Sequence, residues 1–248
     1  MKFLLLFFLI ASYNSFANSN SLHELANKGN ALAQNELGKL YAIGDGVPKN
    51  EAEAFKWFKK SAEQGYKRAQ YNIALAYSLG VGVPKNDTEA FKWFKKSAEQ
   101  GLVLAQYNVA IAYEFGEGVP KNDVEAFKWF KKAAEENHES SQYSLALAYD
   151  FGKGIPINDT KAFDWYKKAA KQGHKSSQAS LGYMYANGES VPENLIKAYL
   201  WTSMSSAQGL ELAKRNLNTY KNQMTKEQIA TAQKLASKCW ESNFKDCD

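Results

Sequence analysis

The chain has 248 residues and a formal net charge of +5, and hydrophobic residues make up 45% of it. A charge this small does not indicate nucleic-acid binding, and no known nucleic-acid motif accompanies it. The three histidines, His23, His138 and His174, are too few and too scattered to indicate a metal site. No phosphate-binding loop or dinucleotide fingerprint occurs, so the sequence implies no cofactor.

The first 17 residues have the features of a secretory signal peptide. Lys2 precedes an apolar run over 3–11, and Ser15-Phe16-Ala17 is the small-x-small pattern of a cleavage site. The run is shorter than the roughly 20 apolar residues that a membrane-spanning helix needs, and no cysteine near the site indicates a lipid anchor. We expect cleavage after Ala17 and a periplasmic or secreted protein that is not an integral membrane protein.

A period of 36 residues organises the rest of the chain. The segment from Tyr66 to Gly101 is nearly repeated once before it and three times after it. Such a period is typical of stacked supersecondary units that share their cores, so one continuous array is expected. We expect an N-terminal capping half-repeat at 18–29, repeats at 30–65, 66–101, 102–137, 138–173 and 174–209, and C-terminal capping helices and a tail at 210–248.

Each repeat is predicted to form two helices. In the second repeat, apolar or small residues over 69–77 recur on one helical face, and Gly80 suits the end of this helix A. Asn86 with Glu89 predicts a capping box at the start of helix B, which we expect to reach Gly101. The same pair recurs as Asn50/Glu53 and Asn122/Glu125, whereas Lys161 and Lys197 replace the glutamate in the last two repeats, where weaker caps are expected.

Helix B is rich in aromatic residues. In the second repeat Phe91, Trp93 and Phe94 lie among small residues, and this face is predicted to pack on helix A and on the next repeat. One such hairpin cannot bury its own apolar face, whereas a stack of hairpins can. Tryptophan recurs at one position of every repeat, as Trp57, Trp93, Trp129, Trp165 and Trp201.

The pattern AQYNxAxAYxxGxGVPKNDxEAFKWFKKAAEQG resembles the Sel1-like repeat, a relative of the tetratricopeptide repeat. The resemblance covers Asn30 to Gly209, and Leu210 to Trp240 is similar to the terminal helices of bacterial members. It implies an all-α fold, an α/α superhelix (solenoid) of helix-turn-helix repeats, that binds a protein or peptide on its concave face. Such members include envelope regulators, host-interaction factors and immunity proteins, and the sequence does not choose among them.

A hydrolase that acts on β-lactams or cell-wall material is the alternative, because some cysteine-rich Sel1-like proteins are linked to penicillin binding or hydrolysis. This chain lacks the cysteine pair that those proteins carry in every repeat. Its one Ser-x-x-Lys, at 242–245, has no companion Ser-Asp-Asn or Lys-Thr-Gly motif and is interpreted as a chance match. We therefore expect a protein without enzymatic activity, and a monomer.

The two cysteines, Cys239 and Cys247, both lie in the C-terminal tail. In an oxidising compartment, a pair that closes a short loop is expected to form a disulfide that holds the last residues against the final helix. That helix is predicted to begin at a capping box formed by Thr225 and Gln228. The alternative is two free thiols on a frayed terminus.

Helix B also repeats a pair of lysines, which forms a basic ridge. One interpretation is an anionic partner. The other is a solvated face whose lysines are partly balanced by glutamates at i, i+3 on the same helix, and we favour this second interpretation. The glutamates are Glu53, Glu89 and Glu125, and in these three repeats Lys56, Lys92 and Lys128 precede the pair. The pairs are Lys59-Lys60, Lys95-Lys96, Lys131-Lys132 and Lys167-Lys168.

Helix A carries a second stripe of residues at i, i+4 and i+8 that we predict to bind the partner. By analogy with tetratricopeptide folds these residues line the concave surface, and tyrosine is a frequent anchor of interfaces. The alternative is that the stripe packs between successive A helices and belongs to the core. The predicted residues are Tyr71 and Leu75, then Tyr107, Ile111, Glu114 and Phe115, then Tyr143, Leu147, Asp150 and Phe151, and finally Tyr183. The outer repeats lose the pattern, with Asn35, Lys39, Ala179 and Asn187 at these positions.

Overall fold

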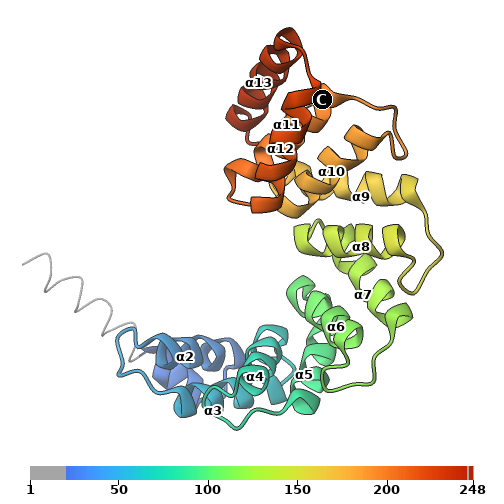
Figure 1. Ribbon diagram of the computed structural model, residues 1–248. Helices are drawn as coiled ribbons and strands as arrows, with labels where there is room; N and C mark the ends of the chain where they lie inside the picture. The colour runs from blue at the N-terminus through green and yellow to red at the C-terminus, as the bar shows by residue number, and fades with distance from the viewer. Residues whose placement is uncertain (1–20, 245, 248) are drawn as a thin grey trace, which may run out of the picture. The chain divides into compact units, whose positions relative to one another are not determined.

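The structure is a computed structural model that describes residues 21–244 and 246–247 (Figure 1). The chain divides into two compact units, unit 1 up to Lys121 and unit 2 from Asn122. Asn122 lies in the middle of the third repeat, so the sequence period gives no sign of this division. The signal peptide expected at 1–17 lies outside the described residues.

Residues 21–244 and 246–247 form helices, turns and loops, and no strand is present among them. Within the described residues, no helix has both the length and the apolar character that crossing a membrane requires. Unit 1 contains a short helical segment at 21–27 and the helices α2 (Ala31–Ile43), α3 (Glu51–Glu63), α4 (Lys67–Leu79), α5 (Asp87–Glu99) and α6 (Val103–Phe115). Unit 2 contains α7 (Asp123–Glu135), α8 (Glu139–Phe151), α9 (Asp159–Lys171), α10 (Lys175–Asn187), α11 (Leu195–Ala207), α12 (Glu211–Gln223) and α13 (Lys226–Glu241).

From α2 to α12, helices that follow one another in the chain pack together within each unit, and α13 packs on α11 (Figure 1). The even-numbered helices α2 to α10 are the predicted A helices, and the odd-numbered helices α3 to α11 are the predicted B helices. In unit 1, α4 packs on both α3 and α5, and in unit 2, α10 packs on both α9 and α11. Each such helix A therefore supplies core to its own repeat and to the preceding one, which confirms the shared core. The central side chains of three A helices, Ile73, Leu145 and Leu181, are fully buried.

Asparagine caps the start of every B helix, but only one half of the predicted capping box forms. The Asn86 side chain accepts a hydrogen bond from the backbone nitrogen of Glu89 (3.1 Å). The Asn86 backbone N–H already donates to the carbonyl of Tyr77 at the end of helix A (2.9 Å). The Asn86 N–H is therefore not available to the Glu89 side chain, and the Glu89 carboxylate pairs with Lys92 (2.8 Å) instead.

The weaker caps expected in the last two repeats are not observed. Asn158 accepts from the Lys161 backbone at 2.9 Å and Asn194 from the Lys197 backbone at 3.0 Å, which matches the distances of the earlier caps. Losing the glutamate changes little, because its side chain does not take part in the cap in the earlier repeats. The lysine side chains lie instead over the rings of Tyr149 and Tyr185, each 5.3 Å from the ring centroid.

The loop between helices A and B packs its second glycine against the preceding repeat. Gly118 has φ +69°, and a Cβ built on it would overlap the Asp87 carbonyl and lie 2.7 Å from the Thr88 nitrogen at the start of α5. Gly46 has the same φ, but a Cβ there would meet nothing within 4 Å. Ser190 takes this position in the fifth repeat with φ 60°, so the left-handed conformation by itself does not demand glycine.

Some aromatic residues of helix B pack on helix A of their own repeat, and others pack on helix A of the next repeat. The phenylalanine two residues before the tryptophan packs edge to face on a tyrosine of the next helix A, as Phe55 does on Tyr77 (5.3 Å) and Phe163 on Tyr185 (5.5 Å). The tryptophans differ in burial: Trp201 is 1% exposed, whereas Trp165 at the same repeat position is half-buried. These contacts confirm that helix B packs on helix A and on the next repeat.

A pair of glutamines joins neighbouring helices in the same way in four of the five repeats, whereas Glu136 replaces the second glutamine in the third repeat. Gln34 of α2 donates its amide to the carbonyl of Ala26 (3.0 Å) and accepts a hydrogen bond from Gln64 of α3 (2.7 Å). The same two bonds recur at Gln70, Gln142 and Gln178, each with the glutamine thirty residues later. Because both amide atoms are used, these buried side chains carry no uncompensated polar group.

Two of the three histidines begin the A helices of the last two repeats. The Nδ1 atoms of His138 and His174 accept hydrogen bonds from the backbone nitrogens of Ser141 and Ser177, both at 3.3 Å. Neither histidine is an exposed helix-start residue, since both are half-buried. Burial lowers the pKa of each imidazole, and the nearby Glu139 opposes this in part. Both rings must be neutral to accept through Nδ1.

Unit 2 is expected to lose stability as the pH falls from about 7 to about 5. The folded-state pKa of each histidine lies below its unfolded value, so the unfolded chain binds more protons in this range. The stabilisation is complete above the unfolded pKa and is lost as the pH falls through the folded one. Replacing both histidines by asparagine keeps the cap, as Asn30 caps α2 with a 2.9 Å bond to Ala33. Thermal unfolding at several pH values should show a weaker pH dependence for this variant than for the wild type, and equal slopes would contradict the assignment.

The C-terminal tail is fastened to unit 2. Thr225 and Gln228 form the predicted capping box at the start of α13, with bonds of 2.8 and 3.2 Å. Cys239 in α13 and Cys247 form a disulfide, and both cysteines are buried. The box and the disulfide hold the two ends of the last helix.

Candidate functional site

Unit 2 contains a groove of about 620 Å³ between the A helices of the last two repeats and α12. Its walls come from α8, α9, α10 and α12, and Glu189 lies at one edge in the loop after α10. Five of the predicted partner-binding residues line this groove: Tyr143, Leu147, Asp150, Phe151 and Tyr183.

The spacing of helix A brings four of these residues onto one face. Tyr143, Leu147, Asp150 and Phe151 lie at i, i+4, i+7 and i+8 of α8, which are neighbours on a helical surface. The stripe runs from half-buried to exposed, because Phe151 is 64% exposed at the C-terminal turn. Tyr183 on α10 is 50% exposed and Leu212 on α12 is 52% exposed. The groove therefore has a half-buried floor and an exposed apolar rim.

The floor of the groove holds a cluster of polar aromatic residues around Asp150. The hydroxyl of Tyr166 donates to Oδ2 of Asp150 at 2.7 Å, and the ring of Tyr143 lies 5.9 Å from that of Tyr166. On its other side, Tyr143 packs on the imidazole of His174 (4.6 Å). Burial raises the pKa of both phenols, and the Asp150 charge raises the pKa further. Both hydroxyls therefore stay protonated over the physiological range and can donate hydrogen bonds.

Unit 1 contains a separate cleft of about 260 Å³ between α2 and α4, floored by α3. It is lined by Leu75 of the predicted stripe and by Leu79, and by Ile43 and Lys39 from the preceding repeat. The first repeat has no tyrosine here. Asn35 takes its position, is fully buried, and accepts a hydrogen bond from Asn72 (2.9 Å) while donating to Glu36 (2.9 Å).

The remaining predicted residues lie on α4 and α6 of unit 1. Tyr71 is half-buried, and its ring packs on Phe94 at 5.6 Å. Burial raises the pKa of Tyr71, and a hydrogen bond to Asn108 lowers it in part. Tyr107, Ile111 and Glu114 are also partly buried, whereas Phe115 is 66% exposed. The tyrosines of the stripe thus contribute to inter-helix packing as well as to the surface.

Sequence reasoning missed the residues that reach the groove from outside helix A. Tyr166 lies on helix B, where the preceding repeats carry Phe58, Phe94 and Phe130, and this change from phenylalanine to tyrosine was the available signal. Leu212 and Asn216 come from α12, which lies beyond the last repeat. Ser176 and Ser180 lie on α10 at positions that the stripe did not include.

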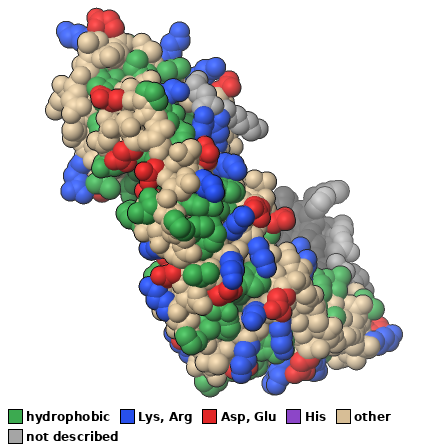
Figure 2. Space-filling view, turned by 90° about the vertical axis from the view of Figure 1, so that its right-hand side faces the viewer, with side chains coloured by type: hydrophobic (Ala, Val, Ile, Leu, Met, Phe, Trp, Pro, Cys, Tyr) green, Lys and Arg blue, Asp and Glu red, His purple; other side chains and the backbone are tan. Residues whose placement is uncertain are grey.

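The basic ridge of helix B is largely paired within the chain. The second lysine of each pair lies over the tryptophan three residues before it, as Lys60 does at 4.1 Å and Lys168 at 3.8 Å from the ring centroid. The lysine that precedes each pair in the first three repeats meets a glutamate, as Lys128 meets Glu125 (2.6 Å). Figure 2 shows side chains of both charges interspersed on the face that it draws. This supports a solvated face over an anion-binding surface.

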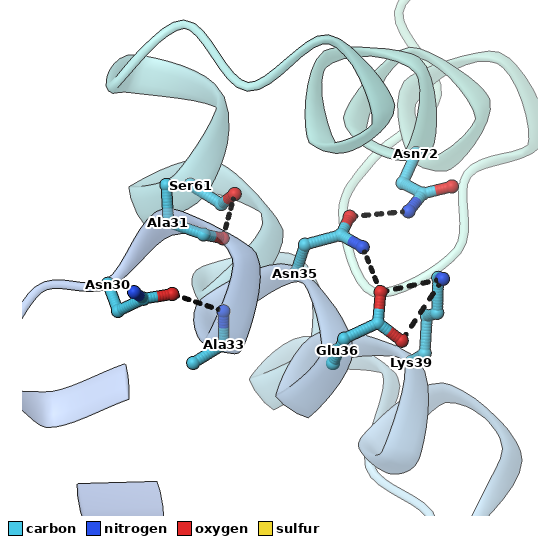
Figure 3. A network of polar contacts seen from close by, with 8 residues as sticks. All are labelled: Asn30, Ala31, Ala33, Asn35, Glu36, Lys39, Ser61 and Asn72. Atoms are coloured by element: carbon cyan, nitrogen blue, oxygen red, sulfur yellow. Dashed lines mark hydrogen bonds and ion pairs between the residues drawn. The ribbon is translucent and has the colours of Figure 1, made fainter. Parts of the chain in front are cut away.

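Polar contacts connect the two helices of the first repeat and join this repeat to the second (Figure 3). The hydroxyl of Ser61 in α3 donates to the carbonyl of Ala31 at the start of α2 (2.6 Å). Glu36, which accepts from Asn35, also pairs with Lys39 (2.8 Å). Asn35 and Lys39, at the first-repeat stripe positions, are thus linked through Glu36, and Asn35 is also bonded to Asn72.

Among the described residues, neither a metal cluster nor the Ser-x-x-Lys match supports the hydrolase alternative. They contain no group of three or more His, Cys, Asp or Glu side chains that could hold a metal ion. The hydroxyl of Ser242 donates to the Cys239 carbonyl (2.8 Å) and accepts from the Asp246 backbone (2.9 Å), so it helps to close the last turn. Lys245, the other residue of the Ser-x-x-Lys match, lies outside the described residues.

Comparison with known proteins identifies the repeat. A family model described as the Sel1 repeat matches residues 31–66, 67–102, 103–138, 139–174 and 175–210, one residue later than the units counted above. A comparison with curated proteins gave no match.

The solved structures that are similar to this chain include the following two. One is c5321, described as a protective antigen present in uropathogenic Escherichia coli strains displaying an SLR fold, with 40% identity and a TM-score of 0.78 over 80% of this chain. The match spans 43% of that longer protein. The other is a Sel1 repeat protein from Oxalobacter formigenes, with 33% identity and a TM-score of 0.74, covering 81% of this chain and 84% of that one. The chain therefore belongs to the Sel1 repeat family of helical repeat scaffolds.

Proposed function

We propose that this protein is an exported, non-enzymatic scaffold that binds a segment of another protein in the groove of unit 2. The observation that carries the proposal is the exposed apolar rim of Phe151, Tyr183 and Leu212 around the polar aromatic floor. Large aromatic side chains that are exposed together beside a concave surface are typical of binding sites. Repeat scaffolds commonly bind protein partners on such a surface.

The aromatic rim supplies the expected anchors. Tyrosine and other aromatic residues contribute much of the binding energy of protein interfaces, because they bury a large area with few rotatable bonds. Phe151 and Tyr183 lie on successive A helices, so one bound segment can contact both. Nothing in the described residues favours the hydrolase alternative, since the Ser242 hydroxyl is engaged in the last turn.

The binding prediction is tested with Phe151 and Tyr183 both replaced by alanine. A partner captured from envelope or culture-supernatant proteins of the source bacterium should bind the double variant at least about 100-fold more weakly, since two anchors of about 2 kcal/mol each are lost. The thermal unfolding temperature should change little, because both side chains are at least half exposed. Ile157→Ala removes an apolar side chain that is 64% exposed in the same unit but does not line the groove, and it serves as the control. A partner held with undiminished affinity by the double variant would exclude the groove.

We also propose export to the periplasm or beyond. The support is the signal-like sequence at 1–17 and the E. coli relative, which is described as a protective antigen. The expected mature protein begins at Asn18, and the intact mass of protein recovered from periplasm or medium checks this. Recovery in the membrane fraction with residues 1–17 still attached would contradict export in this form.

A further inference from the structure

The charged residues that line the groove are all acidic. Among its lining residues, Asp150 and Glu189 carry carboxylates, and none of the described residues that line it is a lysine or an arginine. Lys153, just beyond the end of α8, lies close enough to lower the pKa of Tyr143 in part, but it does not line the groove. A segment with a positive charge therefore complements the site.

Asp150 is placed to receive that charge. It is half-buried, and the Tyr166 hydroxyl donates to one of its oxygens (2.7 Å). An ionised carboxylate has about four acceptor positions, so this bond leaves acceptor capacity for a ligand. The half-buried ring of Tyr143 beside it adds an aromatic surface, whereas Tyr166 is 1% exposed and serves only to hold Asp150. This combination suits a guanidinium group, which forks onto a carboxylate and stacks on aromatic rings.

We propose that the groove of unit 2 recognises an arginine within an apolar peptide segment, with the guanidinium at Asp150 and the flanking apolar residues on Phe151 and Tyr183. The proposal rests on the proposed function and names the chemistry of its partner. Lysine fits less well, because its compact ammonium neither forks onto a carboxylate nor stacks as a plane on a ring.

The test selects peptides from a displayed random library on the immobilised full mature chain. Enriched peptides should share an arginine next to leucine or an aromatic residue. Asp150→Asn keeps an oxygen that can accept from Tyr166, so the fold is retained while the charge is removed. It should weaken binding of the enriched peptides about tenfold or more. Changing the peptide arginine to lysine should weaken binding too, and combining the two changes should cost less than the sum of the separate losses.

The control is Glu117→Gln, which removes an exposed charge in unit 1 at the repeat position of Glu189. It should leave peptide affinity unchanged. Enriched peptides that lack arginine, or that bind Asp150→Asn equally well, would overturn this inference. If the same peptides still lost affinity with Phe151 and Tyr183 replaced, the proposed function would stand. Failure to enrich any peptide would count against both.

A second copy of the chain is another conceivable occupant. Sedimentation velocity of the wild type and of Asp150→Asn distinguishes it, because self-docking would produce a concentration-dependent dimer that the variant loses. A single monomeric species in both proteins is the expected result, and such a dimer would overturn the assignment of a peptide partner.

Discussion

Replacing Trp201 by alanine is expected to lower the free energy of unfolding by about 3 to 5 kcal/mol, the usual cost of removing a fully buried tryptophan. Trp201 lies on α11, is 1% exposed, and its helix contacts α10, α12 and α13. Because these helices share one core, the loss should spread through the end of unit 2 rather than stay in α11. Urea unfolding followed by circular dichroism measures the change.

Trp165→Ala provides the matched control for this prediction. Trp165 occupies the same repeat position in the same unit but is half-buried, with Lys168 over its ring at 3.8 Å. Less apolar area is removed from contact with the protein, so a clearly smaller loss is expected. Equal losses for the two variants would mean that burial at this position does not govern stability.

Replacing Gly118 by alanine is expected to destabilise unit 1 by about 2 to 5 kcal/mol. About 1 to 2 kcal/mol comes from placing a Cβ in the left-handed conformation, and about 1 to 3 kcal/mol from forcing extra atoms into a packed contact. The new methyl group would overlap the backbone at Asp87 and Thr88. The loop or the start of α5 must therefore shift, which should also weaken the Asn86 cap. The shift of the urea midpoint gives the loss.

Gly46→Ala separates the two contributions. Gly46 has the same φ of +69° but no atom within 4 Å of an added Cβ, so only the conformational cost of about 1 to 2 kcal/mol applies. The difference between the two variants measures the packing of the loop on the preceding repeat. If Gly46→Ala cost as much as Gly118→Ala, backbone conformation alone would account for the glycine.

Much of the fold could be predicted from the sequence because the same local signals recur in every repeat. Gly80 ends helix A, Asn86 caps helix B, and the apolar period identifies the buried face that includes Ile73. The missing half of the Glu89 capping box could not be predicted, because the Asn86 N–H that it would use donates to the Tyr77 carbonyl, a contact made only after the hairpin closes. The division at Asn122 has no local signal either.

The candidate site could be predicted only where it lies on the A helices. Helical spacing alone brings Asp150 to the same face as Tyr143 and Phe151. Tyr166 and Leu212 join them through packing between helices, which the period does not describe. The stripe in unit 1 shows the limit of the same reasoning, since Leu75 lines a separate cleft and the ring of Tyr71 packs on Phe94.

The paired glutamines have a consequence for how the length of such a protein can change. Gln34, Gln70, Gln142 and Gln178 each make the same two bonds to the helices on either side, so these four joints are interchangeable. The third repeat differs, because Glu136 replaces the second glutamine and Oε1 of Gln106 has no hydrogen-bond partner. Duplicating or deleting one of the other four repeats in the gene would bring identical joint surfaces together, whereas a partial repeat would misalign them. Recombination between the near-identical segments can therefore lengthen or shorten the array in whole repeats without creating a new type of interface. Residues such as Tyr166 and Asp150, which are not at the joints, distinguish an individual repeat from the others.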